Sequence, residues 1–517
     1  MLRPKSPQNS FYGSYLYDRI VPIDHLLRKI NQVIDFSFVN ELVKDRYTLN
    51  FGRPAEDPEF MLRLCLLQYL YGDSDRQVIE NAKVNLAYKY FLGLAVDEDV
   101  PDDTTVSYFR VKRLGEDKFR QVFENIVSQC IDAGLVKGKR QIVDSTHIEA
   151  DMARNSLTGI IHLCRKNLLK EVEKQEYKVA VRLGAREIRF AKEDRFISKE
   201  VGLKNEVGKA MTLLDGVTEE LQKGRLHPTE RLQGPLELLE KAVADREDGV
   251  KDRLVSPVDP DARTGKKTSK SWSGYKGHVI IEEESEIITA VETTPANRSD
   301  GNQFKPLLKQ QESAHSILPH EISADKAYDS GDNLEYLDSK SITGNISLTR
   351  KANHSGKDFF IVDDFNYNAE TDTLICPGGY TATYHRRAVF HGRNSKKKGT
   401  VFQFRPEQCS VCGLKARCNN SNRGRAVYIS YYHPLFLQMK ERLETDAGKE
   451  AYRNRYRVEH KVADLARYCG MRRSRYRGLS RAKIHTLLAA IVSNIKRMAK
   501  LLWEIPETPP PKLVMVD

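Results

Sequence analysis

Residues 141–149 read QIVDSTHIE, a β-prone run in which the acidic residue Asp144 interrupts the strand-like pattern. Acidic residues are depleted in strands, so Asp144 either ends a strand and caps a turn, which is common, or is held there for a purpose. A second stretch, residues 322–329, reads ISADKAYD and places Asp325 where another strand-like run stops. Acids that end neighbouring strands would meet at one edge of an α/β sheet, where such sheets usually place their sites.

The segments around these two stretches predict an α/β fold with a mixed sheet. Residues 277–291 have the pattern of a β-hairpin, and residues 342–348 that of one more strand. Residues 303–311 and the segment through Leu334 and Leu337 are helical in pattern. Strands and helices therefore alternate in the core, as in the layered α/β folds.

The rest of the chain divides into further predicted units. The short N-terminal helices fit either a helix-turn-helix DNA reader, with Arg110 and Arg113 as DNA contacts, or an ordinary helical bundle. The predicted units are a helical N-terminal domain (1–135), the sheet core (136–155 and 256–350), a helical insertion (156–255), a basic cysteine-containing insertion (351–432), C-terminal helices that complete the core (433–503) and a Pro-rich disordered tail (504–517).

A third candidate carboxylate lies in a strongly basic stretch near the end of the chain. Residues 451–483 contain eleven Lys or Arg residues and two acids, one of which is Glu459. On a single helix, Tyr452, Arg455 and Glu459 would project from one face. Glu459 is then either a partner in ordinary ion pairs on a solvated helix or a metal ligand beside a polyanion.

The overall charge favours a polyanionic partner. The 517 residues have a formal net charge of +12, and residues 380–430 hold eleven Lys or Arg residues and one acid. This clustering favours nucleic acid over a membrane, because the basic runs lack an apolar face for insertion. Residues 1–11 show no signal peptide, and polar residues interrupt the apolar segment 484–503. We therefore expect a cytoplasmic protein.

Four of the eight cysteines fall within the basic insertion. Cys376 is followed, after 32 residues, by a Cys-x2-Cys-x5-Cys pattern formed by Cys409, Cys412 and Cys418. In a cytoplasmic chain this cluster favours a metal over disulfides, and four cysteines suit a tetrahedral structural Zn²⁺. The alternative is four reduced thiols on a β-rich insertion. Because basic residues lie inside the loop that such a site would close, a zinc-stapled, DNA-contacting insertion is a further hypothesis.

Several motifs resemble those of the DDE transposases of bacterial insertion sequences. A Tyr-x2-Arg-x3-Glu-x6-Lys signature is matched through Tyr452, Arg455 and Glu459, and residues 101–110 are similar to the helical domain that precedes the core in one branch of the family. The other matching segments are residues 142–150, 272–278 with 295–300, and 324–330. The resemblance covers most of residues 20–500, and the order and spacing of the motifs make the combination specific.

The resemblance implies a ribonuclease-H-like core and a transposase that cuts element ends and joins them to target DNA. It implies that Asp144, Asp325 and Glu459 hold two Mg²⁺ (or Mn²⁺) ions, and that Tyr452 and Arg455 bind a phosphate of the end nucleotide. The implied partners are double-stranded DNA, comprising terminal inverted repeats and target, and a second copy of the chain in an active homodimer.

One position departs from the signature. Its final Lys falls on Ala466, and the candidate replacement is the next residue, Arg467, although a shift of one residue rotates a side chain by about 100° on a helix. Arg472 and Arg473 are further candidates for this role. Lys276, in the hairpin motif, is a predicted DNA contact, with ordinary strand polarity as the simpler account.

Two other interpretations follow from the same residues. A metal-dependent nuclease or resolvase of this fold would cut DNA without joining it. A catalytically inactive, domesticated copy would bind DNA and do no chemistry. The presence of all three carboxylates speaks against the inactive copy.

Overall fold

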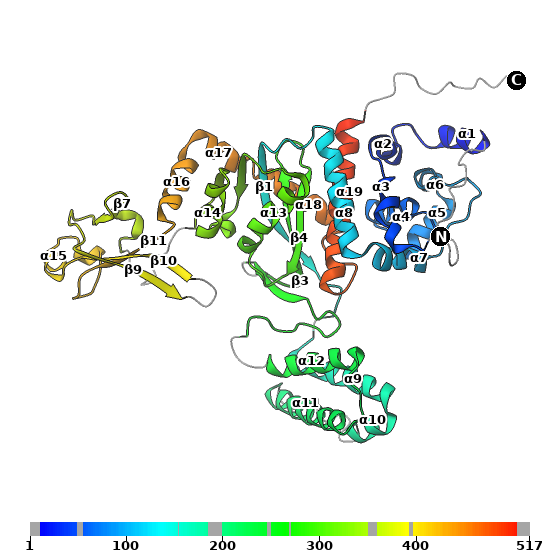
Figure 1. Ribbon diagram of the computed structural model, residues 1–517, viewed down its shortest axis with the longest axis horizontal. Coiled ribbons are helices and arrows are strands. Elements are labelled where there is room, and N and C mark those ends of the chain that lie inside the picture. Colours follow the sequence, from blue (N-terminus) through cyan, green and yellow to red (C-terminus); the bar gives the residue numbers. More distant parts are fainter. Residues whose placement is uncertain are drawn as a thin grey trace.

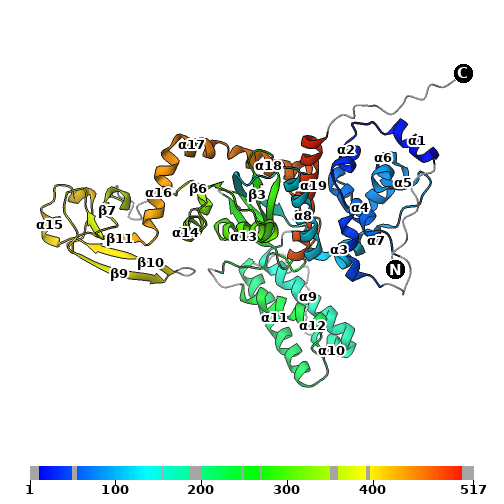
Figure 2. The same cartoon turned by 45° about the horizontal axis from the view of Figure 1, so that its top comes forward.

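The computed structural model describes residues 11–48, 55–153, 155–184, 199–245, 250–267, 270–349, 359–391 and 396–503. The predicted disordered tail, residues 504–517, lies outside these ranges. Figure 1 shows a central sheet with helices on both faces, the N-terminal helices at one end of the molecule and the cysteine-containing insertion at the other. The helical insertion projects from the side of this core, as the second view in Figure 2 also shows.

The central sheet is mixed, as the sequence predicts. Its strands run in the order β2-β3-β1-β5-β6, and β4 also pairs with β3. The three pairings that β3 makes are antiparallel, whereas β1–β5 and β5–β6 are parallel. The strands are β1 (Arg140–Glu149), β2 (Arg263–Lys267), β3 (Lys270–Glu282), β4 (Ile288–Pro295), β5 (Glu321–Ala324) and β6 (Thr343–Ile346). This arrangement confirms the ribonuclease-H-like fold class.

Strand β3 serves two partners on the same side because it is long. Its first half pairs with β2, ending at Arg263↔Gly274, and its second half pairs with β4 from Tyr275 onward. Gly274 stands at the change of partner with φ +151°, and a Cβ there would collide with the Ile148 carbonyl oxygen of β1. Only glycine allows this approach, because it has no Cβ.

Helices cover one face of the sheet through a core of Leu, Ile and Phe side chains. Val143 of β1, Ile322 of β5 and Phe304 are among its fully buried members. The helices on this face are α13 (Phe304–His315), α14 (Gly331–Ser339) and α16 (His433–Glu444). Because Val143 precedes Asp144 directly, packing of this face fixes the strand that carries the first candidate carboxylate.

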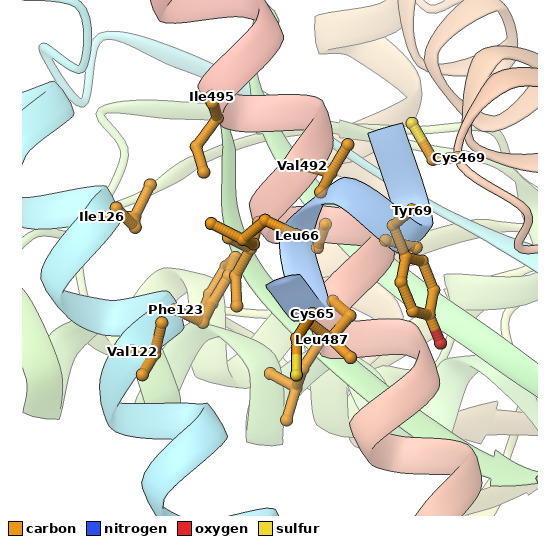
Figure 3. Close-up of a cluster of buried hydrophobic side chains, with 14 of the residues drawn as sticks. Cys65, Leu66, Tyr69, Val122, Phe123, Ile126, Cys469, Leu487, Val492 and Ile495 are labelled. Carbon is orange, nitrogen blue, oxygen red and sulfur yellow. The ribbon is translucent and has the colours of Figure 1, made fainter. Parts of the chain in front are cut away.

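The other face of the sheet packs against two long helices, α8 (Gly115–Asp132) and α19 (Leu479–Leu502). Figure 3 shows that the same helices also pack against α4, so that a single core continues from the sheet into the N-terminal helices. The labelled side chains there are Cys65, Leu66 and Tyr69 of α4, Val122, Phe123 and Ile126 of α8, and Leu487, Val492 and Ile495 of α19.

The N-terminal helices surround α4, most of whose side chains are buried. Asp57 caps this helix by accepting a hydrogen bond from the Glu59 amide, and Pro58 occupies the first turn, as the sequence predicts. The helices are α1 (Phe11–Ile20), α2 (Leu26–Val33), α3 (Phe38–Leu42), α4 (Pro58–Tyr71), α5 (Asp75–Val84), α6 (Leu86–Leu92) and α7 (Asp103–Tyr108).

The helical insertion after β1 has a hydrophobic core of its own. Its helices are α9 (Leu157–Gln175), α10 (Tyr177–Gly184), α11 (Lys199–Gln222) and α12 (Glu230–Ala244). Leu168, Val217 and Leu239 are fully buried in it. Among the helices formed by the described residues, none combines the length and apolar character needed to cross a membrane.

The cysteine-containing insertion is built from short strands with a small core. A three-stranded sheet has the order β11-β10-β9, and β7 pairs with β8. The elements are β7 (Asn366–Asn368), β8 (Thr373–Ile375), β9 (Tyr384–His391), β10 (Lys396–Gln403), α15 (Pro406–Ser410) and β11 (Ala426–Ser430). The chain then returns to the core through α16, α17 (Asp446–Arg453) and α18 (Tyr456–Tyr468).

Candidate active site

The two candidate aspartates lie on neighbouring parallel strands. The β1–β5 ladder pairs Gln141 with Ile322 and Ile142 with Ser323. Continued by two residues, this register brings Asp144 level with Asp325, which follows directly after the last residue of β5. The expectation that both acids end strands is half wrong, because β1 continues five residues beyond Asp144 in its antiparallel ladder with β3.

Asp144 is a largely buried carboxylate with few partners. Burial raises its pKa to about 6, and the neighbouring charge of Asp325 adds to the effect. Its Oδ1 accepts a hydrogen bond of 2.8 Å from the Ser145 amide. Arg455 and Lys267 act in the opposite direction and lower the pKa. Two carboxylates brought together in a desolvated place are stable as anions only when a cation joins them.

Asp325 is held at the start of a short 3-10 turn, Lys326–Tyr328. Its Oδ1 accepts a hydrogen bond of 2.8 Å from the Ala327 amide, which fixes one carboxylate oxygen. The side chain is partly exposed, so its other oxygen faces a more open surface than Asp144 does. The two aspartates thus present a buried and an accessible oxygen donor at the same edge of the sheet.

Tyr328 belongs to this site although the sequence does not single it out. Its side chain is 1% exposed, and its hydroxyl has no well-directed hydrogen bond in the described part of the chain. Burial raises its pKa well above the usual value, and the negative charges of Asp144, Asp300 and Asp325 raise it further. The hydroxyl is therefore a protonated donor among three carboxylates. Its spacing of three residues from Asp325 was visible, but nothing in the pattern distinguishes it from a core tyrosine.

Tyr452, Arg455 and Glu459 come together, but not on one helix. Helix α17 ends at Arg453, a turn follows, and α18 begins at Tyr456. The prediction of a continuous helix is therefore wrong, yet the contacts that it implied are made. The Arg455 guanidinium lies 5.7 Å from the centre of the Tyr452 ring and 2.6 Å from Glu459 Oε1. The backbone of both turn residues stays right-handed, which preserves the common face.

Arg455 connects Glu459 to the aspartates. One of its terminal nitrogens pairs with Glu459, and the other, Nη1, is buried without a hydrogen-bond partner among the described residues. Its charge also lowers the pKa of Asp144. The Glu459 side chain itself is 55% exposed. Glu459 thus lies on a helix that packs against β1, with its carboxylate turned to Arg455.

The last basic position of the signature is open to three arginines. Arg467 is exposed near the end of α18, and Ala466 beside it is partly buried. After α18 the chain runs along the end of β1, where the Glu149 amide donates to the Arg472 carbonyl and the Ser474 amide to the Glu149 carbonyl. Arg472 is exposed there, whereas Arg473 pairs with Asp151 at 3.1 Å.

Arg110 is not a DNA contact in this structure, contrary to the prediction. Its side chain is 3% exposed and donates two hydrogen bonds of 2.8 Å to the Asp75 carboxylate. Its guanidinium also lies 4.5 Å from the centre of the Tyr476 ring. Arg110 therefore ties the N-terminal helices to the segment that follows α18, which is a structural role.

The other two predicted contacts are also held within the protein. Arg113 donates to the Arg46 carbonyl and lies against the Tyr47 ring at 4.4 Å. Lys276 donates to Asp300 Oδ1 at 2.8 Å and to the Arg298 carbonyl at 2.9 Å. Lys276 therefore holds Asp300 next to Tyr328, and for Arg113 a DNA contact stays a prediction.

The donor set suits a hard divalent cation. Carboxylate oxygens are the ligands that Mg²⁺ and Mn²⁺ prefer, and the buried Asp144 beside Asp325 favours a cation between them. In the described part of the chain, however, no group of three or more His, Cys, Asp and Glu side chains already has the arrangement of a metal site. Because Glu459 is paired with Arg455, release of that pair is needed before Glu459 can join the two aspartates.

The four cysteines of the insertion are free thiols of intermediate exposure that line a common pocket. They lie at the far end of the molecule from the N-terminal helices, and the core helices separate them from those helices (Figure 1). The other cysteines, Cys65, Cys130, Cys164 and Cys469, are buried.

Two families of transposase domains match this chain. Residues 15–112 match a family described as a transposase domain (DUF772), and residues 239–495 match the transposase DDE domain. The second match includes Asp325 and Glu459 and begins after most of the helical insertion, so Asp144 lies before it. Together the two matches cover more than half of the chain.

The mixed sheet, the carboxylate edge and the two family matches define a transposase. The chain belongs to the DDE transposases and is consistent with a transposase of an insertion sequence. Its N-terminal helices correspond to the first matched domain, and the core with its C-terminal helices corresponds to the second. Such an enzyme acts on DNA.

Proposed function

We propose that this transposase cuts the ends of a mobile DNA element and joins them to target DNA by phosphodiester hydrolysis followed by strand transfer. Asp144, Asp325 and Glu459 are the metal ligands, and two Mg²⁺ or Mn²⁺ ions are the cofactor. The observation that carries the proposal is the pairing of Asp144 with Asp325 at the edge where β5 ends. A desolvated carboxylate beside a second one is a costly arrangement that a cation relieves.

Two divalent ions, when bound, would activate the attacking oxygen and stabilise the leaving oxygen of an in-line displacement. In the first step a water oxygen attacks the phosphorus at the element end, and the bond to the 3′ oxygen breaks. In the second step that 3′-hydroxyl attacks a target phosphorus, and the target strand's own 3′ oxygen leaves. Each step exchanges one phosphodiester oxygen for another, so no covalent enzyme–DNA intermediate is needed.

The chain's own residues bind and orient the DNA. Arg455 has a buried, unpaired Nη1 and a flexible partner in Glu459, so a phosphate oxygen could take the place of that carboxylate. Guanidinium binds phosphate in a fixed geometry with two parallel donors. Tyr452, stacked near Arg455 and 41% exposed, offers a ring face and a hydroxyl to the same nucleotide. Arg467 and Arg472 extend the basic surface past α18.

Release of Glu459 by the phosphate links substrate binding to assembly of the metal site. When Arg455 turns to the DNA, Glu459 is freed to complete the ligand set of the aspartates. Tyr328 donates its proton toward the carboxylates and holds their oxygens in place. Because two element ends are cut, a homodimer on double-stranded DNA is the active complex, and the chain works in the cytoplasm of a bacterial host.

An end-cleavage assay tests this proposal. The substrate is duplex DNA that carries the inverted repeats flanking the coding sequence, incubated with the full-length chain and Mg²⁺ or Mn²⁺. We expect Asp144→Asn, Asp325→Asn and Glu459→Gln each to reduce cleavage at least a thousandfold, because each removes a charged ligand. Glu444→Gln, an exposed acid at the end of α16, is the matched control and should cleave at the wild-type rate.

The assay distinguishes this proposal from its alternatives. Cleavage that is unchanged in Asp144→Asn would remove the catalytic assignment. Cleavage by the wild-type chain without any joining of the released 3′ ends would identify a nuclease. DNA binding without metal-dependent cleavage, in the presence of the correct ends, would identify an inactive copy.

A further inference from the structure

The cysteine-containing insertion has too small a hydrophobic core to be stabilised by packing alone. Its described residues bury Phe365, Leu374, Phe402, Phe404, Val427 and Ile429. Its strands are short, and the two-stranded sheet β7–β8 has three residues in each strand. Modules of this size that cannot build a sufficient core usually contain disulfides or a structural metal. All four cysteines here are free thiols, so no disulfide fills this role.

The four cysteines converge from three separate segments of the insertion. Cys376 follows β8, Cys409 lies on α15 with Cys412 just after it, and Cys418 ends a short 3-10 turn. All four line the same pocket. A Cβ built on Gly378 would lie 3.1 Å from Cys412 Sγ and 3.7 Å from Cys376 Sγ, so these two sulfurs flank one point.

The backbone around the thiols is folded into tight turns that present them inward. The Gly379 amide donates to the Cys376 carbonyl at 2.9 Å, and Gly379 has φ +82°, which a side chain would strain. The Lys415 amide donates to the Cys412 carbonyl at 3.0 Å, and the Cys418 amide donates to the Lys415 carbonyl at 2.9 Å. The turns therefore carry Cys376, Cys412 and Cys418 to the pocket independently of one another.

The charges around the pocket favour a bound cation. Burial raises the pKa of the Cys418 thiol, and the nearby Cys409, Cys376 and Cys412 raise it further. Arg425 lowers it, but this guanidinium is already engaged with the Cys418 and Phe360 carbonyls at 3.1 and 2.9 Å. Four thiols in mutual reach would repel one another as thiolates unless a cation lay between them.

We propose that Cys376, Cys409, Cys412 and Cys418 bind one structural Zn²⁺ that holds the cysteine-containing insertion together. Zn²⁺ accepts four thiolates in a closed tetrahedral site and has no redox chemistry, which suits a site with no free position for substrate. A soft sulfur set selects against Mg²⁺, so this site is distinct from the carboxylate edge of the sheet. Binding replaces up to four thiol protons, which pass to solvent.

The metal would fasten the end of β8 to the segment between β10 and β11. Phe360 and Arg425 join the same region, because the Phe360 amide donates to the Arg417 carbonyl at 2.8 Å. The base of the β9–β10 hairpin, whose Arg386 and Arg387 are exposed, depends on this junction for its direction. The inference concerns folding of the insertion and does not rest on the transposition chemistry.

Metal analysis of the purified full-length chain tests the proposal. We expect one zinc per chain, and replacement by Co²⁺ should give the visible d–d bands and sulfur-to-metal charge-transfer absorption of a tetrahedral thiolate site. Cys376→Ser, Cys409→Ser, Cys412→Ser and Cys418→Ser should each reduce zinc content severalfold. Cys164→Ala, at a buried cysteine of the helical insertion, is the control and should keep one zinc.

Several outcomes would overturn the proposal. They are a reduced wild-type chain with four reagent-accessible thiols and no zinc after growth in zinc-replete medium, iron in place of zinc with iron–sulfur absorption, and full zinc content in all four serine variants. The Co²⁺ spectrum of the wild-type chain keeps the test valid even if a serine variant fails to fold.

Discussion

The carboxylate edge of the sheet and the cysteine pocket both gather groups that repel one another as anions, but they are supported very differently. Asp144 and Asp325 extend from strands fixed by large cores on both faces of the sheet. The four cysteines lie on turns around a small core. Rigid support means that the carboxylates stay in place without a metal, whereas the cysteine turns lack such support.

The ligand chemistry differs in the same direction. The oxygen site keeps an exposed acid, Glu459, and an arginine that can turn to phosphate, so it can exchange ions and substrate. The sulfur site presents four ligands and no open position. We infer that the metal at the sheet edge serves reaction and the metal in the insertion serves folding. Each of the following predictions separates these two roles.

The largest expected effect is loss of structure in the insertion without zinc. In Cys412→Ser we expect amide hydrogens of β9, β10 and β11 to exchange as in an unfolded segment, because structural zinc contributes about 10–16 kcal/mol of apparent binding free energy. In Asp325→Asn the central sheet should keep its protection, since Asn can also cap the following turn. Hydrogen exchange with mass spectrometry measures both. Equal protection of the insertion in Cys412→Ser and the wild type would contradict the comparison.

A pH-dependent stability of the metal-free chain follows from burial of Asp144. Its pKa is raised from 3.8 unfolded to about 6 folded, so the folded state binds more protons and stability falls as pH rises through this interval. The loss amounts to about 3 kcal/mol above pH 7, from 1.36 kcal/mol per pKa unit. Asp144→Asn should remove it and stabilise the metal-free chain at pH 7. Denaturant unfolding at pH 5 and pH 7.5 measures this, and a less stable Asn variant at pH 7.5 would contradict it.

Substitution of Arg455 should affect reaction rather than folding. Arg455→Gln removes a charge that lowers the pKa of Asp144, so the acidic limb of the pH–rate profile should shift to higher pH. Loss of one charge-assisted hydrogen bond of about 1.5–3 kcal/mol should also weaken binding of the element end about tenfold or more. Arg453→Gln, an exposed arginine two residues earlier, is the control. Equal pH profiles and affinities for the two variants would remove Arg455 from the site.

The smallest effect is expected from crowding the cysteine pocket. In Gly378→Ala the new methyl would press on Cys412 Sγ at 3.1 Å, whereas at Gly413 a methyl would meet no atom within 4 Å. We expect Gly378→Ala to weaken zinc retention in a chelator competition about tenfold, and Gly413→Ala to leave it unchanged. A stronger loss in Gly413→Ala would mean that the thiols do not converge beside Gly378.

The sheet and its site were predictable to the extent that they depend on local pattern. Asp144 and Asp325 stood out because acids are rare in strands, and the parallel β1–β5 ladder brings them together as the pattern predicts. The length of β1 beyond Asp144 was not predictable, because it depends on pairing with β3, a strand more than a hundred residues away. For the same reason Tyr328 was missed: its hydroxyl becomes significant only beside three distant carboxylates.

Predictions from basic residues were the weakest. A basic pattern identifies charge but not its partners, and Arg110 and Lys276 both proved to have buried or local carboxylates within reach. The turn between α17 and α18 was missed because Asn454 and Arg455 are compatible with a helix and keep helical dihedral angles. Tertiary contacts, rather than propensity, decide such positions.

The most direct test of the central claim, that the carboxylates at the sheet edge carry out strand transfer, is a joining assay with a pre-cut element end. With Mg²⁺, the wild-type chain should join an end that has a 3′-hydroxyl to target DNA and should not join the same end with a 3′-deoxy terminus. Asp144→Asn should join neither. Joining by Asp144→Asn at the wild-type rate, or joining of the 3′-deoxy end, would contradict the account.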